Sequence, residues 1–147
     1  MSGTGEQGES WAAKRGDAAA EHAARLDRKR ADEAEQATAL LQKFVRDARE
    51  RGLPTVALKA RALNGRTLYR TGLTGWYLRR NGTLAVDEHG DYYVLSTPTS
   101  LQARLRGATL TPSDPPLVVG AGGRDGESIP LPDLLRQRLD AGETWGR

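Results

Sequence analysis

Residues 74–96 read TGWYLRRNGTLAVDEHGDYYVLS, and this stretch decides the fold. Two turn signals divide it. Asn81-Gly82 is a strong short-range signal for a β-hairpin, and Asp87-Glu88-His89-Gly90 predicts a second tight turn. The segments around these turns are rich in Trp, Tyr, Leu and Val, which favour strands. The stretch therefore predicts an antiparallel β-meander of three strands.

A two-residue turn at Asn81-Gly82 would also set the register of the first hairpin, with Tyr77 opposite Val86. The two strand faces predicted from this register carry Tyr77, Leu84 and Val86 on one side and Trp76, Leu78 and Ala85 on the other. Because both faces carry apolar residues, we expect both to be covered.

Residues 10–51 predict one long helix, because they contain no Pro, a single Gly (Gly16), many Ala and several oppositely charged pairs four positions apart. Gly52, followed by Pro54, marks the expected end of this helix. Residues 1–9 carry three Gly and no apolar residue after the initial Met, so they predict a disordered tail.

The two halves of this helix differ in their apolar residues. In residues 37–51, apolar side chains recur every three or four positions, which predicts docking on a core. This stripe consists of Ala37, Leu40, Leu41, Phe44, Val45 and Ala48. In the outer half the apolar positions from Ala20 onward are nearly all Ala, with Leu26 alone among larger residues, so docking there would bury little area. We expect this half to project and to meet an unknown protein partner or a second copy of itself.

Residues 53–147 predict a compact β-rich domain that ends in a short helix. Further strands are expected at residues 66–70 and 117–119, and residues 101–111 predict either a strand or a short helix. The C-terminal helix carries an apolar stripe of Leu131, Leu134, Leu135 and Leu139, preceded by Pro130. The predicted fold class is therefore α+β, with a long N-terminal helix, an antiparallel β-meander and a short C-terminal helix.

The composition of the 147 residues excludes several classes of site. The chain has no Cys, so it can form neither a disulfide nor a thiolate zinc site. It has only His22 and His89, too few for an imidazole-rich metal cluster. No apolar run approaches the roughly 18 to 20 residues that cross a bilayer, and residues 1–10 lack the pattern of a secretory signal. We expect a cytoplasmic protein without a metal, a cofactor or a membrane partner.

The net charge of +3 is concentrated in the middle of the chain. Residues 53–110 hold eight basic and three acidic residues, whereas residues 1–52 are neutral and residues 111–147 are net acidic. Arginines there alternate with aromatic residues, a combination that single-strand nucleic-acid binders use for phosphates and bases. The residues hypothesised to bind nucleic acid are Arg66, Arg70, Arg79 and Arg80. In the competing interpretation the aromatic residues fill the core, because the chain has a single Phe.

Two other clusters contain groups that could bind a ligand or take part in acid–base chemistry. The glycine-rich loop at residues 120–128 could hold a ligand through Gly122, Gly123 and Arg124, although it lacks the Gly-Lys-Ser/Thr end of a phosphate-binding loop. Asp87, Glu88, His89 and Asp91 could do acid–base work or bind a cation, but the tip of a turn offers no walls that would shift a pKa. We therefore assign no catalytic and no metal-binding residue.

Four segments carry a resemblance to a group of proteins. They are GWYLRR (75–80), DYYVL (91–95), PPLVVG (115–120) and GGRDGES (122–128). Over roughly residues 40–142 the chain resembles a group of small uncharacterised proteins of high-GC bacteria. The resemblance implies a bacterial cytoplasmic setting and one compact module, and it implies no activity or site residues.

These observations favour a non-enzymatic protein-interaction or adaptor module. Nucleic-acid binding through residues 53–110 is the alternative hypothesis. A third hypothesis is an enzyme that acts through His89 with Asp87 or Asp91.

Overall fold

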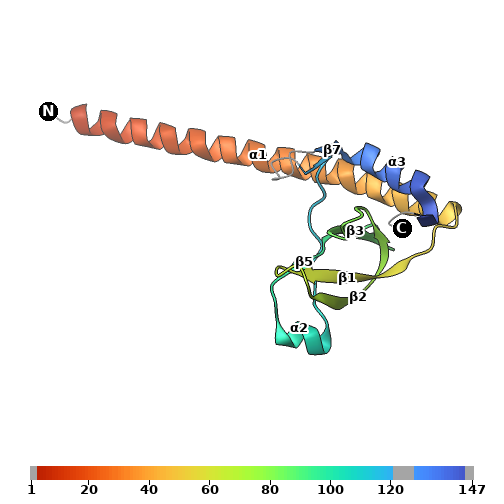
Figure 1. Cartoon of the computed structure of the whole chain (residues 1–147). Helices are drawn as coiled ribbons and strands as arrows, with labels where there is room; N and C mark the ends of the chain where they lie inside the picture. Colours follow the sequence, from red (N-terminus) through yellow and green to blue (C-terminus); the bar gives the residue numbers. More distant parts are fainter. Residues whose placement is uncertain (1–2, 121–127, 145–147) are drawn as a thin grey trace. The chain divides into compact units, whose positions relative to one another are not determined.

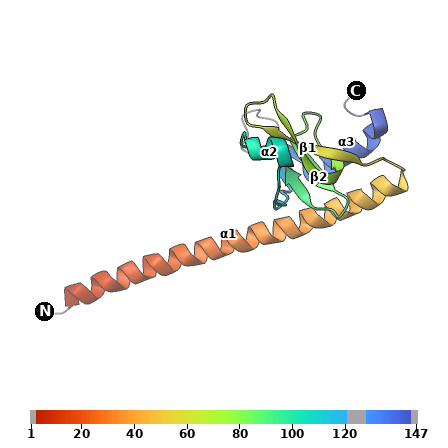
Figure 2. The same cartoon turned by 90° about the horizontal axis from the view of Figure 1, so that it is seen from below.

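Figures 1 and 2 show a computed structural model of the chain, which describes the backbone of residues 3–120 and 128–144 and the side chains of residues 11–120 and 128–143. Its helices are α1 (Gly3–Glu50), α2 (Leu101–Arg106), α3 (Leu131–Ala141) and the 3-10 helix η1 (Gly142–Thr144). Its strands are β1 (Val56–Ala62), β2 (Leu68–Tyr77), β3 (Leu84–Asp87), β4 (Tyr92–Val94), β5 (Ser96–Thr97), β6 (Val118–Val119) and β7 (Ile129–Pro130). The predicted α+β class, with a long N-terminal helix, an antiparallel meander and a short C-terminal helix, is confirmed.

The chain divides into two compact units, residues 1–33 and 34–147. In the first unit every residue from Trp11 to Asp32 is helical and exposed. The helical backbone already begins at Gly3, inside the segment expected to be a disordered tail, residues 1–9. The side chains of that segment lie outside the described part, so its disorder stays a prediction.

Helix α1 ends in a glycine-capped turn. Gly52 has a φ of +70°, and its N–H donates to the Arg49 carbonyl at 3.1 Å. The N–H of Leu53 donates to the Ala48 carbonyl at 2.8 Å. These two bonds form a Schellman motif, in which the residue after the glycine packs back onto the helix. Leu53 and Ala48 are both buried, so the turn ends the helix and also places Leu53 in the core.

The main sheet has five strands in the order β4-β3-β2-β1-β5. Its neighbours are antiparallel except β1 and β5, which run parallel. The register of β1 and β2 shifts between Ala57 and Lys59. Three residues of β2 therefore lie opposite the single residue Leu58, and we call these three residues the excursion of β2. The left-handed Gly72 (φ +72°) lies in this excursion, and the hydroxyl of Thr71 donates to the Leu58 carbonyl at 2.6 Å. The remaining strands, β6 and β7, form a separate antiparallel pair.

The first hairpin departs from the predicted register by one residue. Tyr77 pairs with Ala85 and not with Val86. The connection has three residues, because Gly82 takes a left-handed φ of +71° and its N–H donates to the Arg79 carbonyl at 3.0 Å. A shift of one residue exchanges the faces of a strand. One face therefore carries Trp76, Leu78, Leu84 and Val86, and the other carries Tyr77 and Ala85.

Other strand boundaries also differ from the predictions. Strand β1 was not predicted, and β2 is one continuous strand where residues 66–70 and 74–80 were expected to form two. The expected strand over residues 91–96 is divided between β4 and β5. Residues 101–106 adopt the helical alternative as α2, and the expected strand over residues 117–119 is β6.

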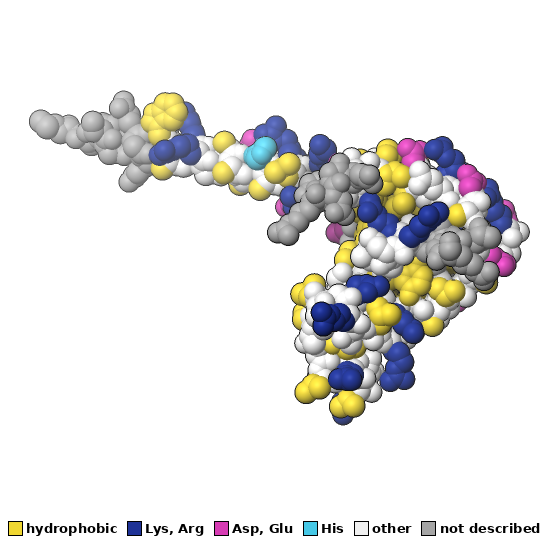
Figure 3. Space-filling view, viewed as in Figure 1, with side chains coloured by type: hydrophobic (Ala, Val, Ile, Leu, Met, Phe, Trp, Pro, Cys, Tyr) yellow, Lys and Arg dark blue, Asp and Glu magenta, His cyan; other side chains and the backbone are white. Residues whose placement is uncertain are grey.

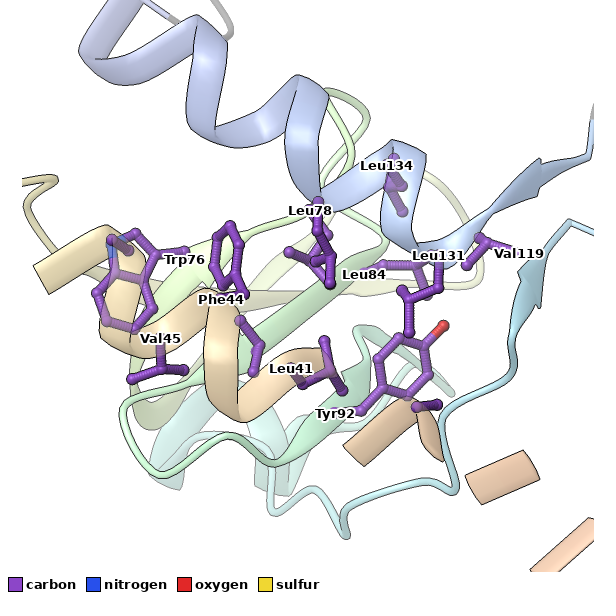
Figure 4. Packing of buried hydrophobic residues seen from close by; sticks show 14 of the residues in the cluster. Leu41, Phe44, Val45, Trp76, Leu78, Leu84, Tyr92, Val119, Leu131 and Leu134 are labelled. Atoms are coloured by element: carbon purple, nitrogen blue, oxygen red, sulfur yellow. The ribbon is translucent and has the colours of Figure 1, made fainter. Parts of the chain in front are cut away.

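The main core of residues 34–147 lies where α1 and α3 cover one face of the sheet (Figure 4). Phe44 is only 2% exposed, and its ring meets Trp76 edge-on, with the ring centroids 6.0 Å apart. Leu134 and Leu135 of α3 belong to the same buried cluster. Phe44, which belongs to the stripe predicted to dock on a core, is therefore buried in that core.

The opposite face of the sheet is also covered, as expected. Figures 1 and 2 show α2 on the side of the sheet away from the last turns of α1. Ala103 of α2 packs with Ala60, Ala62 and Tyr69 in a second buried cluster. The Tyr69 hydroxyl accepts a hydrogen bond at 3.0 Å from the N–H of Ser100, the residue that caps α2.

We expect Phe44→Ala to lower the free energy of unfolding by about 3–5 kcal/mol, because it empties the centre of the main core. The matched change Leu26→Ala, at an exposed position of α1, should alter it by no more than about 0.5 kcal/mol. Urea unfolding followed by circular dichroism measures both. Equal losses in the two variants would show that the outer part of α1 is as much a part of the core as Phe44.

Candidate functional site

The first candidate surface is the outer part of α1, residues 11–33. Every residue from Trp11 to Asp32 is exposed, and Trp11 is 66% exposed. Nζ of Lys14 lies 5.9 Å from the centroid of its ring. Among the described residues, no charged side chain of this segment forms an ion pair. The segment is thus a solvated helix whose side chains are available for contact.

One stripe of α1 continues the docked face outward. Positions spaced alternately by four and three residues lie on one side of a helix and form the seam of coiled coils. In residues 34–50 this stripe contains the buried Leu41, Val45 and Ala48. Continued toward the N-terminus, it consists of Ala13, Asp17, Ala20, Ala24, Asp27, Ala31 and Ala34. The same helix face therefore changes from a buried apolar stripe to an exposed stripe of small residues, five alanines and two aspartates.

The arginines hypothesised to bind nucleic acid are divided between the two ends of β2. Arg66 and Arg70 lie at its start, in the hairpin with β1, whereas Arg79 and Arg80 follow its end, in the turn before β3. Ten residues of strand span about 33 Å, so these two pairs do not share one contact point. The sequence-based set also omitted Lys59, which lies directly opposite Arg70.

The aromatic residues of the basic segment belong to the core. Tyr69, Trp76, Tyr92 and Tyr93 are each at most 5% exposed, and Tyr77 is half-buried. The hydroxyl of Tyr77 accepts a hydrogen bond from the N–H of Lys59 at 2.9 Å. Among residues 34–144 as described, none of these rings is free to stack on a base, which favours the core interpretation of the aromatic residues.

The cluster at residues 87–91 is a turn held by one carboxylate. Asp87 is 5% exposed, and its Oδ1 accepts hydrogen bonds from the N–H groups of His89 and Asp91, both at 2.9 Å. His89 itself is exposed. The described residues contain no group of three side chains that could hold a metal ion. Asp87 therefore acts as a backbone cap, and the geometry offers His89 no acid–base partner in a cleft.

A buried arginine has a structural role that the sequence analysis did not anticipate. Arg138 of α3 is 8% exposed, and burial lowers the pKa of its guanidinium. Its Nε donates to the Tyr77 carbonyl at 2.8 Å, and its Nη1 donates to the Gly142 carbonyl at 3.0 Å. Arg138 thus fastens the C-terminal helix to the end of β2. The ligand loop proposed at Gly122, Gly123 and Arg124 lies outside the described residues.

Comparison of the chain with protein-family models, curated proteins and solved structures finds no match. None of the helices, over the residues described, has the length and hydropathy needed to cross a membrane. The two exposed surfaces, one on α1 and one on the β1–β2 hairpin, are therefore interpreted from their own chemistry.

The buried tyrosines predict how stability changes at high pH. Burial, then the charges of Asp87 and Asp91, and finally a hydrogen bond to Asp87 raise the pKa of Tyr93. Burial also raises the pKa of Tyr92, against the opposing charge of Arg79. A tyrosine that ionises less readily in the folded state stabilises the fold fully below pH of about 10, and this contribution is lost as the pH rises through the folded-state pKa.

We therefore expect the free energy of unfolding to fall above a pH of about 10, and to fall less steeply in Tyr93→Phe and in Tyr92→Phe. Urea unfolding at a series of alkaline pH values measures these slopes. Slopes identical to wild type in both variants would contradict the raised pKa of Tyr92 and of Tyr93 in the folded state.

Proposed function

We propose that the protein is a non-enzymatic protein-interaction module whose contact surface is the outer part of α1, residues 11–35. The observation that supports this proposal is the unbroken exposure of the helix from Trp11 to Asp32. A helix usually keeps its place in a fold by burying one face. From Trp11 to Asp32 the helix buries no face against the described part of the chain, and an exposed Trp is a residue type that protein interfaces favour.

The chemistry of the exposed stripe fits a second copy of the same helix. Small residues such as Ala20, Ala24 and Ala31 allow two helix backbones to approach closely. If the small-residue stripe forms the seam, the positions that flank it on one side alternate in charge. These flanking residues are Lys14, Glu21, Arg28 and Glu35.

The alternation of charge favours an antiparallel pair. In an antiparallel pair of helices, these flanking positions of one helix face the same set of positions on the other helix. The numbers of two facing residues then always have the same sum. Lys14 then meets Glu35 of the second copy, and Glu21 meets Arg28. Both contacts, and their two symmetry equivalents, join opposite charges. A parallel pair in register would place each charge at the same height as its own copy and would lack this complementarity.

The setting that we propose for this module is the bacterial cytoplasm, and its role is that of an adaptor. The setting rests on the resemblance of residues 40–142 to small proteins of high-GC bacteria, and the adaptor role rests on the exposed helix surface.

Sedimentation equilibrium of the full chain tests the proposal. We expect a concentration-dependent dimer that is weakened by salt, because its flanking ion pairs are exposed. Glu21→Arg places like charges opposite each other twice, so we expect it to weaken dimerisation about tenfold. The double variant Glu21→Arg with Arg28→Glu restores opposite charges and should recover the wild-type dimer.

Ala24→Glu and Ala18→Glu provide a matched pair. Both substitute the same residue type on the same helix, but only Ala24 lies on the small-residue stripe. Ala24→Glu should abolish the dimer, and Ala18→Glu should leave it intact. A wild-type monomer at every concentration would exclude self-association. A photocrosslinker at residue 24 that captures no protein in the native cell would exclude the interaction function as well.

A further inference from the structure

One side of the β1–β2 hairpin is an uncovered basic face. We call it the ribbon face, and it is formed by the cross-strand pairs Ala57–Thr74, Lys59–Arg70 and Arg61–Leu68. Of these six residues five are exposed, and Arg61 is half-buried. The alternate residues of β1 point to the other side, where Leu58, Ala60 and Ala62 are buried. The ribbon face is therefore the solvent side of a well-packed hairpin.

Lys59 and Arg70 are held close together with no described group to neutralise them. Their pairing is of the non-hydrogen-bonded type, in which side chains are nearest. The N–H of Lys59 donates instead to the Tyr77 hydroxyl, and the carbonyl of Arg70 accepts instead from Ala108 at 2.7 Å. Like charges directly opposite each other destabilise a sheet. The repulsion between Lys59 and Arg70 therefore destabilises the fold locally, and an anionic ligand would remove this repulsion.

The stretch of sequence around this pair contains no acidic residue. The sequence from Arg51 to Val86 holds no Asp or Glu. Within the described part of the chain, Lys59, Arg61, Arg66 and Arg70 form no ion pair. Figure 3 shows the same pattern, with basic and hydrophobic side chains and no acidic one on the visible side of the lobe that carries α2.

The tip of the ribbon is rigid. The Oδ1 of Asn64 accepts hydrogen bonds from the N–H groups of Arg66 and Thr67, at 2.9 and 3.1 Å, and Gly65 has a φ of +74°. Nη1 of Arg61 donates to the Gly65 carbonyl at 3.0 Å, which ties the strand to the turn. The rest of the Arg61 guanidinium stays available for a ligand. The backbone that carries the cations is thus held by hydrogen bonds within the hairpin.

We propose that the ribbon face binds the phosphate backbone of a double-stranded nucleic acid. The ribbon face and its tip together carry four cations, Lys59, Arg61, Arg66 and Arg70, and the planar guanidinium of the three arginines matches phosphate oxygens in a bidentate manner. The ribbon face belongs to a five-stranded sheet, so it would contact the phosphates along the outside of a duplex. Contacts of this kind neutralise phosphates and do not depend on sequence.

The alternatives fit the ribbon face less well. Binding of single strands relies on exposed aromatic rings, and the described tyrosines and tryptophan of residues 53–144 are buried or half-buried. Docking on a membrane surface favours exposed Trp or Phe together with a broad apolar face. The ribbon face has Leu68 as its one large apolar side chain.

Fluorescence anisotropy with a labelled mixed-sequence DNA duplex and the full-length protein tests this inference, which does not depend on self-association through α1. We expect binding at low salt, with log K falling against log salt at a slope of about −3 to −4 for four phosphate contacts. The variant Lys59→Gln with Arg70→Gln should weaken binding about tenfold or more and flatten the slope by about 2.

The control is Arg79→Gln with Arg80→Gln, which removes the same charge at the other end of β2 and should weaken binding less than about threefold. Thermal unfolding should show the ribbon variant to be at least as stable as wild type, because it removes the opposed like charges.

Four results would overturn the proposal. They are no duplex binding by wild type at low salt, equal losses in the two variants, equal affinity for a single strand, and displacement of the duplex by poly-glutamate as effective as that by unlabelled duplex. The last result would identify an acidic protein surface as the ligand.

Discussion

The structure of residues 34–147 depends on the indole of Trp76. Its Nε1 donates to the Leu53 carbonyl at 3.1 Å, and its ring meets Phe44 edge-on. Leu53 is also the residue that closes the Schellman motif at the end of α1. One side chain therefore joins the helix, the turn after it and the C-terminal end of β2. A buried indole must find an acceptor for its N–H, so this geometry fixes where the sheet lies against the last turns of α1.

The parts of the fold that the sequence predicted are those with local signals. The apolar stripe of α1, the glycine at its end and the turn at residues 87–90 each depend on neighbours along the chain. Strand β1 was missed because its inward residues include Ala60 and Ala62, which are small and have low strand propensity, and because its pairing is with other strands. The hairpin register was wrong by one because a Gly can serve either a two- or a three-residue turn.

The candidate surfaces could be predicted only in part, for the same reason. Exposure of the outer helix follows from its Ala-rich composition, since such a stripe buries little area. The grouping of the cations does not follow from sequence, because the excursion of β2 around Gly72 decides which residues of β1 and β2 face each other. Lys59 and Arg70 are eleven positions apart in sequence and adjacent only through that register.

The two proposed surfaces differ in the pattern of their charges, and this difference allows one chain to use both. The helix alternates charge so that it complements its own copy, whereas the ribbon face carries one sign and repels its own copy. A dimer formed through α1 would carry two ribbon faces on one particle. Where both faces can reach one duplex, the second contact becomes intramolecular and the combined affinity exceeds that of either face. Self-association would then strengthen the binding of a duplex by a weak, sequence-independent surface, and salt would weaken both steps together.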